Sequence, residues 1–236
     1  MRGRTVILAG GSGGLGGAMA RQLSDEGARL VISYRDNEAR AIAFDSIATL
    51  VQCDLCATED RRKLRAAAPD VYGLVVFAGD PARVAKPDEF EDAAMTSHES
   101  NYFGPIMMAR ETADFMREVG TPGAIVLISS MQAVSPFPGS TAYAAQKAAL
   151  IHGARILANE CRGPANIRLN VVCPGVTKAG MAEVSVASGK YDRYLSEGAI
   201  SRFGRAEDIA RAVRFFLEPD NYVTGQVLTV DGGLTL

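Results

Sequence analysis

The chain has 236 residues and a mass of 25.0 kDa, and 47% of its residues are hydrophobic, so it can bury a large core as one domain. Its net charge of −2 and isoelectric point near 5.8 provide no basic surface, because lysine and arginine are scattered among acidic residues. We therefore expect a single domain over residues 1–236 and exclude nucleic acid as a partner.

The amino-terminal segment has some features of a secretory signal, because Met1-Arg-Gly-Arg precedes an apolar run. That run lasts only from Val6 to Ala9, whereas a signal requires about 7 to 15 apolar residues. No other segment approaches the about 18 apolar residues of a membrane span. We expect a cytoplasmic protein that does not bind a membrane.

Short apolar runs rich in Val, Ile and Leu alternate along the chain with segments of helical periodicity. The runs predict buried parallel strands at Thr5–Ala9, Leu30–Tyr34, Thr49–Gln52, Leu74–Ala78, Ala124–Ser129, Leu169–Cys173 and Val227–Val230. The periodic segments predict helices at Leu15–Glu26, Glu59–Ala67, Met95–Val119, Ala142–Cys161 and Ala206–Leu217. This alternation predicts an α/β fold with a doubly wound, parallel, seven-stranded Rossmann-like sheet.

A glycine-rich turn joins the first predicted strand to the first predicted helix and reads Ala9-Gly10-Gly11-Ser12-Gly13-Gly14-Leu15-Gly16. Glycine lets the backbone turn sharply and approach a pyrophosphate closely, while the amino terminus of the next helix presents its positive dipole end. A turn of this kind between a buried strand and a helix indicates dinucleotide binding. The residues expected to bind the dinucleotide here are Gly10, Ser12, Gly13, Gly14, Leu15 and Gly16.

Six of the predicted strands end beside residues that can bind a ligand or act on one. In a doubly wound sheet the ligand site lies outside the carboxyl ends of the strands, near the point where strand order reverses. In chain order the candidates are the glycine turn, Tyr34–Arg35, Asp54, Ala78–Gly79, Ser130 and Pro174–Gly175. We expect them to converge on one site.

The end of the second predicted strand, Tyr34–Arg35, bears on the choice of nucleotide. An acidic side chain at position 34 would bind a ribose 2′-hydroxyl and repel a 2′-phosphate, whereas a guanidinium at Arg35 can pair with that phosphate. NADP(H) is therefore favoured over NAD(H). Asp36 keeps NAD(H) open, because a small shift of the loop could bring its carboxylate to the ribose, and Arg35 could simply be solvated.

Tyr143 and Lys147 lie four residues apart in A-Y-A-A-Q-K, which is one turn of a predicted helix, so both can act on the same atom. A phenol with a pKa of about 10 is a poor base at neutral pH, but a nearby cation favours the phenolate. The pair predicts a general acid/base. The structural alternative is a core aromatic residue beside a solvated lysine.

Cys53 and Cys56 form a C-x-x-C pair, but no second cysteine pair and no nearby histidine completes a metal site. We expect small, buried or partly buried thiols and no bound metal. A redox or metal-binding role is the alternative.

With these motifs in place, the chain resembles the short-chain dehydrogenase/reductase family over essentially its whole length. The resemblance rests on the Gly-x-x-x-Gly-x-Gly spacing that begins at Gly10, and on Ser130 thirteen residues before the Tyr143–Lys147 pair. The segments I-S-R-F-G-R-A-E-D-I-A and T-G-Q-V-L-T-V-D-G-G are similar to the 3-oxoacyl-[acyl-carrier-protein] reductase branch. The chain departs from the family pattern at Ala9, Val76–Phe77 and Ala179, where the family usually has threonine, two asparagines and threonine.

The resemblance implies roles for several further residues. Ser130 would hold the substrate oxygen, and Asn101 would fix a helix irregularity and a water beside the lysine, with a simple kink before Gly104–Pro105 as the alternative. Asp54, with its neighbour Leu55, would accept from the adenine amino group or cap the next helix. The expected catalytic group is thus Asn101, Ser130, Tyr143 and Lys147. The further residues expected to bind the cofactor are Ala78, Gly79, Tyr143, Lys147, Pro174, Gly175, Val176 and Thr177, of which Lys147 would bind the nicotinamide ribose and the last four the nicotinamide.

The resemblance also implies features around the site. Residues 178–201 would form a substrate lid, with packing against a partner helix as the alternative. The short span from Arg35 to Asp54 implies a reduced helix near Glu38–Phe44. A homotetramer would be built from the two long helices and the carboxyl-terminal strand.

The expected reaction is hydride transfer between NADP(H) and a carbonyl or secondary alcohol, with no metal and no covalent intermediate. In reduction, Tyr143 would protonate the developing alkoxide, Ser130 would stabilise that oxygen, and Lys147 would lower the tyrosine pKa and bind the nicotinamide ribose. A 3-oxoacyl thioester or a related ketone is the expected substrate. The alternatives are an NAD-linked secondary alcohol dehydrogenase and a catalytically silent dinucleotide-binding sensor or regulatory subunit.

Overall fold

Seven strands lie side by side in one parallel sheet, in the order β3-β2-β1-β4-β5-β6-β7. The coordinates are a computed structural model that describes residues 1–84 and 86–236. Strand order reverses between β1 and β4, so the sheet is doubly wound, as the sequence predicts. The strands are β1 Thr5–Ala9, β2 Arg29–Tyr34, β3 Ala48–Gln52, β4 Val71–Val76, β5 Gly123–Ile128, β6 Ile167–Pro174 and β7 Val227–Val230.

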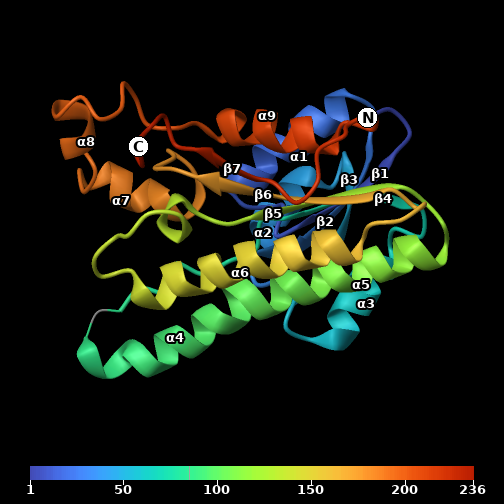
Figure 1. Cartoon of the computed structure of the whole chain (residues 1–236), viewed down its shortest axis with the longest axis horizontal. Coiled ribbons are helices and arrows are strands. Elements are labelled where there is room, and N and C mark those ends of the chain that lie inside the picture. The colour runs from blue at the N-terminus through green and yellow to red at the C-terminus, as the bar shows by residue number, and fades with distance from the viewer. Residues whose placement is uncertain (85) are drawn as a thin grey trace.

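Helices cover both faces of the sheet (Figure 1). On one face α1 packs beside α9 over an apolar core, and on the other face α3, α5 and α6 cover a second core. The α-helices are α1 Gly14–Asp25, α2 Glu38–Ala41, α3 Thr58–Ala66, α4 Phe90–His98, α5 Gly104–Glu118, α6 Thr141–Glu160, α7 Glu183–Ala187, α8 Arg193–Ser196 and α9 Ala206–Leu217. Within the described residues, no helix has both the length and the apolar character that crossing a bilayer requires.

Most predicted elements are confirmed, and two of them differ for identifiable reasons. The helix expected over Met95–Val119 begins earlier, at Phe90, and a π-helical turn at Glu99–Phe103 divides it into α4 and α5. The strand expected over Leu74–Ala78 runs instead over Val71–Val76. It ends early because the backbone amides of Phe77 and Ala78 both donate to the carbonyl of Ala9, which turns the chain out of the ladder.

The reduced helix expected near Glu38–Phe44 is also present. It consists of the four-residue α2 and a 3₁₀ turn at Ile42–Phe44. The Asn37 side chain accepts a hydrogen bond from the Arg40 amide at 2.9 Å and so caps α2. Phe44 is buried against the α1 side of the sheet and fastens the end of this short segment.

Arg168 joins β6 to the end of α9 and is only 4% exposed. Its guanidinium donates to the carbonyl oxygens of Phe216 and Glu218, each at 2.8 Å. The Tyr72 hydroxyl donates to a third carbonyl there, that of Leu217, at 3.2 Å. A buried cation therefore satisfies carbonyl groups that a helix leaves unpaired at its carboxyl terminus.

Replacing Arg168 with methionine should lower the free energy of unfolding by about 3 kcal/mol, because one buried and one partly buried carbonyl group lose charge-assisted hydrogen bonds. Urea denaturation followed by circular dichroism measures the change. The exposed Arg62 pairs with Glu59 on the surface, so Arg62→Met serves as the control and should change stability by less than about 1 kcal/mol. Equal losses in the two variants would show that the buried contacts of Arg168 contribute little.

Candidate active site

A cavity of about 470 Å³ opens at the carboxyl ends of β1 to β4, next to the point where strand order reverses. The predicted ligand-binding residues that line it are Gly10, Ser12, Gly13, Gly14, Leu15, Gly16, Tyr34, Arg35, Asp54, Leu55, Ala78 and Gly79. Those that lie outside its lining are Tyr143, Lys147, Pro174, Gly175, Val176 and Thr177. The convergence of strand ends expected from the sequence is therefore present for the first four strands.

The glycine turn brings the backbone into contacts that leave no space for side chains. Gly10 has a φ of +71°, and a Cβ there would lie 2.8 Å from the backbone nitrogen of Ala78. A Cβ on Gly16 would lie 2.5 Å from the Cα of Gly11, which is why α1 can start directly beneath the turn. The turn is also tied to β2, because the Gly10 amide donates to the Ser33 hydroxyl at 3.0 Å.

The amino terminus of α1 suits an anionic group. The helix has no side-chain cap, and its first turn has no acidic residue, so nothing within its own sequence neutralises the positive end of its dipole. A Cβ on Gly13 would meet only the Gly10 carbonyl, at 3.6 Å, so the approach to the helix past Gly13 is open. These features fit the pyrophosphate of a dinucleotide.

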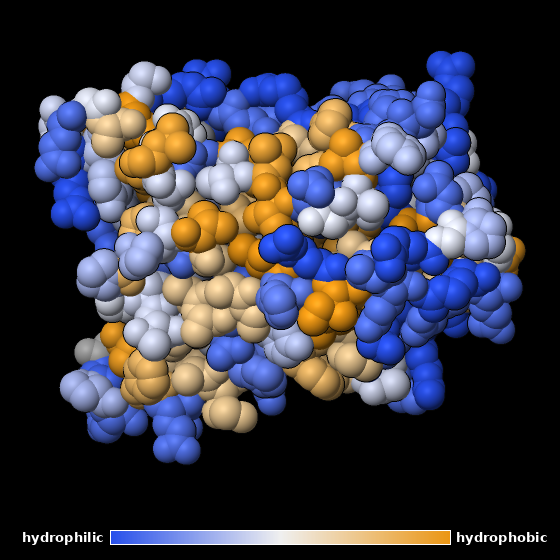
Figure 2. All heavy atoms as spheres, viewed as in Figure 1, coloured by the Kyte–Doolittle hydropathy of each residue, from blue (hydrophilic) through white to orange (hydrophobic). Residues whose placement is uncertain are grey.

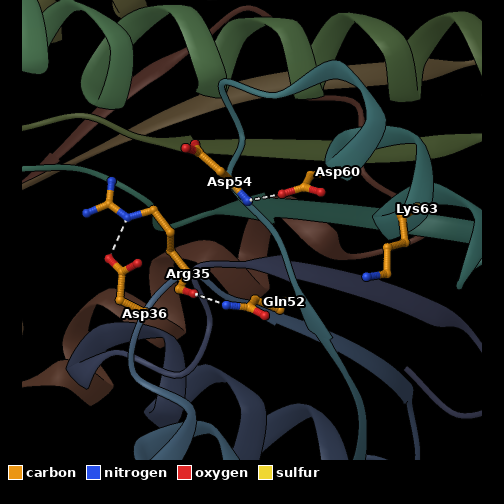
Figure 3. A pocket seen from close by; sticks show the side chains of 6 residues that line it. All are labelled: Arg35, Asp36, Gln52, Asp54, Asp60 and Lys63. Carbon is orange, nitrogen blue, oxygen red and sulfur yellow. Dashed lines mark hydrogen bonds and ion pairs between the residues drawn. The ribbon is translucent and has the colours of Figure 1, made fainter.

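The cavity is strongly charged at Arg35, Asp36 and Asp54. These three residues also line a second cavity of about 500 Å³ (Figure 3). The guanidinium of Arg35 pairs with the carboxylate of Asp36 at 2.7 Å. The backbone carbonyl of Arg35 accepts a hydrogen bond from the Gln52 side chain at 3.0 Å. Hydrogen bonding to Asp36 raises the pKa of Arg35. The cation predicted to meet a 2′-phosphate is thus already paired with the neighbouring carboxylate.

Asp54 shapes its own loop and does not cap α3. Its Oδ1 accepts from the Cys56 amide at 2.9 Å, and its backbone amide donates to Asp60 at 2.9 Å. The cap position of α3 is Ala57, which has no side-chain hydrogen bond, so the capping alternative is wrong. The loop that carries Asp54 and Leu55 lies along the cavity.

The C-x-x-C pair also reaches this cavity, because both Cys53 and Cys56 line it. Both cysteines are free. Burial raises the pKa of Cys53 to about 12 and that of Cys56 to about 11, so both thiols stay protonated at neutral pH. This agrees with small, partly buried thiols.

The π-helical turn places Asn101 in the interior. Pro105 has no amide hydrogen to bond the carbonyl four residues before it, so the α-helical ladder is interrupted here. The Asn101 side chain accepts from the Asp80 amide at 3.1 Å and donates to the Asp80 carbonyl at 2.9 Å and to Ser97 at 3.0 Å. The helix irregularity expected at Asn101 is therefore a π turn that is fastened to the loop after β4.

Lys147 is 2% exposed, and its ammonium donates to the Ile128 carbonyl at 3.0 Å. Desolvation lowers the pKa of Lys147 to about 8. A Cβ on Gly79 would lie 3.2 Å from its Nζ and 2.7 Å from the Asn101 Oδ1. Gly79 also lines the cavity, so the lysine and the asparagine lie directly behind the cavity wall.

Tyr143 lies on the same side of α6, with the Lys147 Nζ 5.9 Å from the centre of its ring. Burial raises the pKa of Tyr143 to about 12, and hydrogen bonding with Ser130 opposes that shift only in part. The expectation that Lys147 makes this phenol acidic is therefore wrong for the protein alone. The cost of removing the phenolate from water therefore dominates the pKa of Tyr143.

Ser130 and Ser129 point in different directions at the end of β5. Ser130 is close enough to Tyr143 to influence its pKa, and its hydroxyl also accepts from the Gln132 amide at 3.2 Å. The Ser129 hydroxyl instead donates to the Lys147 carbonyl at 2.9 Å and holds α6 against the sheet. The structure thus brings Ser130, Tyr143, Lys147 and Asn101 together.

The segment after β6 returns across the glycine turn. A Cβ on Gly14 would lie 2.5 Å from the Gly180 nitrogen, and Gly180 and Met181 both line the cavity. The hydroxyl of Thr177 is buried and donates to the Gly175 carbonyl at 3.0 Å, so the structure does not bring it to the cavity. Ala179 immediately precedes a 3₁₀ turn at Gly180–Ala182.

The region predicted as a lid packs near the catalytic group. Tyr191 and Tyr194 stack with ring centres 6.2 Å apart, beside an apolar cluster that contains Met131, Val176 and Phe203. Met131 directly follows Ser130, and Tyr191 is close enough to Tyr143 to raise its pKa. The segment therefore packs beside the residues expected to be catalytic.

Sequence reasoning missed two cations around the cavity. Arg40, on the short α2, lines it, and Arg83, from the loop after β4, donates to the Met181 carbonyl at 3.2 Å. The short span from Arg35 to Asp54 could have indicated that Arg40 lies at the cavity, because a short helix keeps its few residues close to the end of β2. No pattern in the sequence indicates Arg83.

The family profile described as enoyl-(acyl carrier protein) reductase matches residues 9–235. The chain is 32% identical to a protein named 3-oxoacyl-[acyl-carrier-protein] reductase FabG from Rickettsia bellii, over 100% of this chain and 98% of the relative. It is also 32% identical to a protein named L-rhamnose 1-dehydrogenase (NAD(P)(+)) from Azotobacter vinelandii, over 98% and 96% of the two chains.

Solved structures agree with these relatives. A short-chain dehydrogenase/reductase from Mycobacterium ulcerans superposes with a TM-score of 0.91 at 25% identity, over 100% of this chain and 90% of the other. A 7α-hydroxysteroid dehydrogenase with NADH gives 0.86 at 28% identity, over 98% and 94%. An actinorhodin polyketide ketoreductase with NADPH gives 0.85 at 25% identity, over 98% and 97%. The chain belongs to the short-chain dehydrogenase/reductase family of oxidoreductases.

Proposed function

We propose that this protein is an NADP(H)-dependent ketoreductase that interconverts a carbonyl compound and a secondary alcohol. One observation carries the proposal: Lys147 and Asn101 lie directly behind Gly79, at the wall of a cavity that begins at an uncapped, glycine-lined helix terminus. Tyr143 and Ser130 lie beside them. A proton donor therefore lies near one end of a site suited to a dinucleotide.

The cavity residues would bind the cofactor along its length. The first turn of α1 would hold the pyrophosphate, the loop at Asp54 and Leu55 the adenine, and Lys147 the nicotinamide ribose. When bound, the cofactor supplies the hydride. Pro174 to Thr177 would reach the nicotinamide only if the segment that now contacts Gly14 moves, and residues 178–201 would then serve as the lid.

The proton chemistry would follow from the burial of the catalytic group. With its pKa raised to about 12, Tyr143 is protonated at neutral pH and is poised to donate to an alkoxide formed in reduction. Ser130 would hold the same oxygen. Lys147, with a pKa lowered to about 8, can return a proton to the tyrosine. The Ile128 carbonyl accepts from its ammonium and holds it beside Gly79, at the cavity wall.

The substrate is proposed from the relatives. One is named for a 3-oxoacyl thioester and another for a polyketide, and both names describe the reduction of a ketone. We therefore propose a 3-oxoacyl thioester or a related ketone. NAD-linked oxidation of a secondary alcohol is the second candidate, favoured by the pairing of Arg35 with Asp36, which removes one cation from the nucleotide end.

A homotetramer is also proposed, on the basis of exposed apolar side chains. Met95 on α4 and Phe103 on the π turn before α5 are 57% and 38% exposed, and Phe215 on α9 and Leu228 on β7 are 53% and 39% exposed. Figure 2 shows apolar side chains gathered across the middle of one face. The free state of all four cysteines is in keeping with a cytoplasmic location, which we propose as well.

Replacing Tyr143 with phenylalanine should retain dinucleotide binding and reduce ketone turnover by about 10² to 10⁴-fold, because the proton donor is lost while the packing is kept. Titration of the purified protein with NADPH and a ketone-reduction assay measure the two effects. Tyr222→Phe is the control and should be unaffected, since Tyr222 is fully exposed. Full activity in the Tyr143 variant would remove this residue from the mechanism.

Arg40 should contribute to the preference for NADP(H). Within residues 1–84 and 86–236 its guanidinium forms no hydrogen bond or ion pair, unlike that of Arg35, so it is available to a 2′-phosphate. Arg40→Gln should raise the KM for NADPH by about tenfold and leave the KM for NADH unchanged.

Steady-state kinetics with both nucleotides make this comparison. Arg2→Gln is the matched control, because Arg2 is an exposed cation far from the cavity lining. A parallel loss for both nucleotides, or a wild-type preference for NADH, would contradict the assignment of NADP(H).

A further inference from the structure

Arg61 is a buried arginine next to the cavity that the proposed chemistry does not use. It is 2% exposed although it lies on α3, a helix whose other charged residues are exposed or half-buried. Its NH1 donates to the Leu55 carbonyl at 2.7 Å, a contact that is fully buried. Leu55 belongs to the loop that lines the cavity at the proposed adenine position.

The other donors of Arg61 are fixed mainly by Glu111 on α5 and also by Thr58 at the start of α3. Its Nε and NH2 bind the two carboxylate oxygens of Glu111 at 2.8 to 3.1 Å, and NH2 also donates to the Thr58 hydroxyl at 3.1 Å. The pairing with Glu111 is bidentate, so it defines the plane of the guanidinium as well as its position. The Arg61 NH1 group, which donates to the Leu55 carbonyl, is therefore held in one orientation.

The loop is held at two further points. Asp60, which precedes Arg61 on α3, accepts from the Asp54 amide at 2.9 Å, and Figure 3 shows this contact from the cavity side. Gly104, at the start of α5, approaches Leu55 so closely that a Cβ there would lie 2.9 Å from the Leu55 Cβ. Asp60 and Arg61, which are consecutive on α3, thus bind the amide of Asp54 and the carbonyl of Leu55. The start of α5 packs against Leu55.

We propose that Arg61, oriented by Glu111, is a positioning residue for the dinucleotide. It sets the Asp54–Leu55 backbone in the conformation that receives the adenine, while the proton chemistry occurs at the other end of the cavity. This inference rests on the proposed function. It predicts that loosening Arg61 weakens cofactor binding and spares the chemical step, because neither Arg61 nor Glu111 contacts Tyr143, Lys147 or Ser130.

The test compares Arg61→Lys with Arg168→Lys. Each variant keeps a positive charge but loses the guanidinium of a buried arginine that donates to backbone carbonyls. Of the two arginines, only Arg61 contacts the loop that lines the cavity. Arg61→Lys should raise the Kd for NADPH by about tenfold, with kcat at saturating NADPH within about twofold of wild type. Arg168→Lys should lower the Tm and leave the Kd unchanged.

Glu111→Gln is the second variant, and it tests the pair if Arg61→Lys does not fold. It keeps one acceptor oxygen for the guanidinium, so it should raise the Kd for NADPH by a smaller factor, again without loss of kcat. An unchanged Kd in a folded Arg61 or Glu111 variant would overturn the proposal, as would an equal rise in Arg168→Lys. Absence of dinucleotide binding by the wild-type protein would instead overturn the proposed function itself.

Discussion

The burial of one lysine ammonium behind the cavity wall is the constraint on which the rest of the site depends. Lys147 can remain in the interior because the Ile128 carbonyl accepts from it and because Gly79 has no side chain to occupy the same space. The cost of desolvation appears as a pKa lowered to about 8. The pKa of the Tyr143 phenol shifts the other way for the same reason, so below about pH 8 the ammonium is present and can return a proton to a tyrosine that has given its own proton away.

This arrangement requires close approach between backbone segments that are far apart in sequence. Gly10 meets the loop after β4, Gly14 meets the segment after β6, and Gly79 meets the side chains of α6 and of the π turn. Each contact is too short for a Cβ, so small residues at the strand ends allow these segments to pack closely around the cavity. The Asn101 side chain adds to this packing, because it accepts from the Asp80 amide and donates to the Asp80 carbonyl.

Much of this could be predicted from the sequence. Apolar runs and helical periods indicated the sheet and its order of elements, and the glycine turn and the Tyr143–Lys147 spacing indicated the two ends of the site. What could not be predicted depends on tertiary contacts. The distances between motifs along the sequence do not show that Arg35 pairs with Asp36, or that the Thr177 hydroxyl turns inward to the Gly175 carbonyl. The rise in the pKa of Tyr143 was missed because desolvation cannot be read from a four-residue interval.

The protonation of Lys147 tests the central claim most directly. NMR spectroscopy of protein labelled with ¹⁵N at lysine Nζ can follow this amine through a pH titration, with Lys147→Met to assign its signal. We predict a midpoint at about pH 8, with the ammonium present below it and the neutral amine above it. A midpoint near the ordinary value of 10.5 would mean that water reaches the amine and would contradict the account.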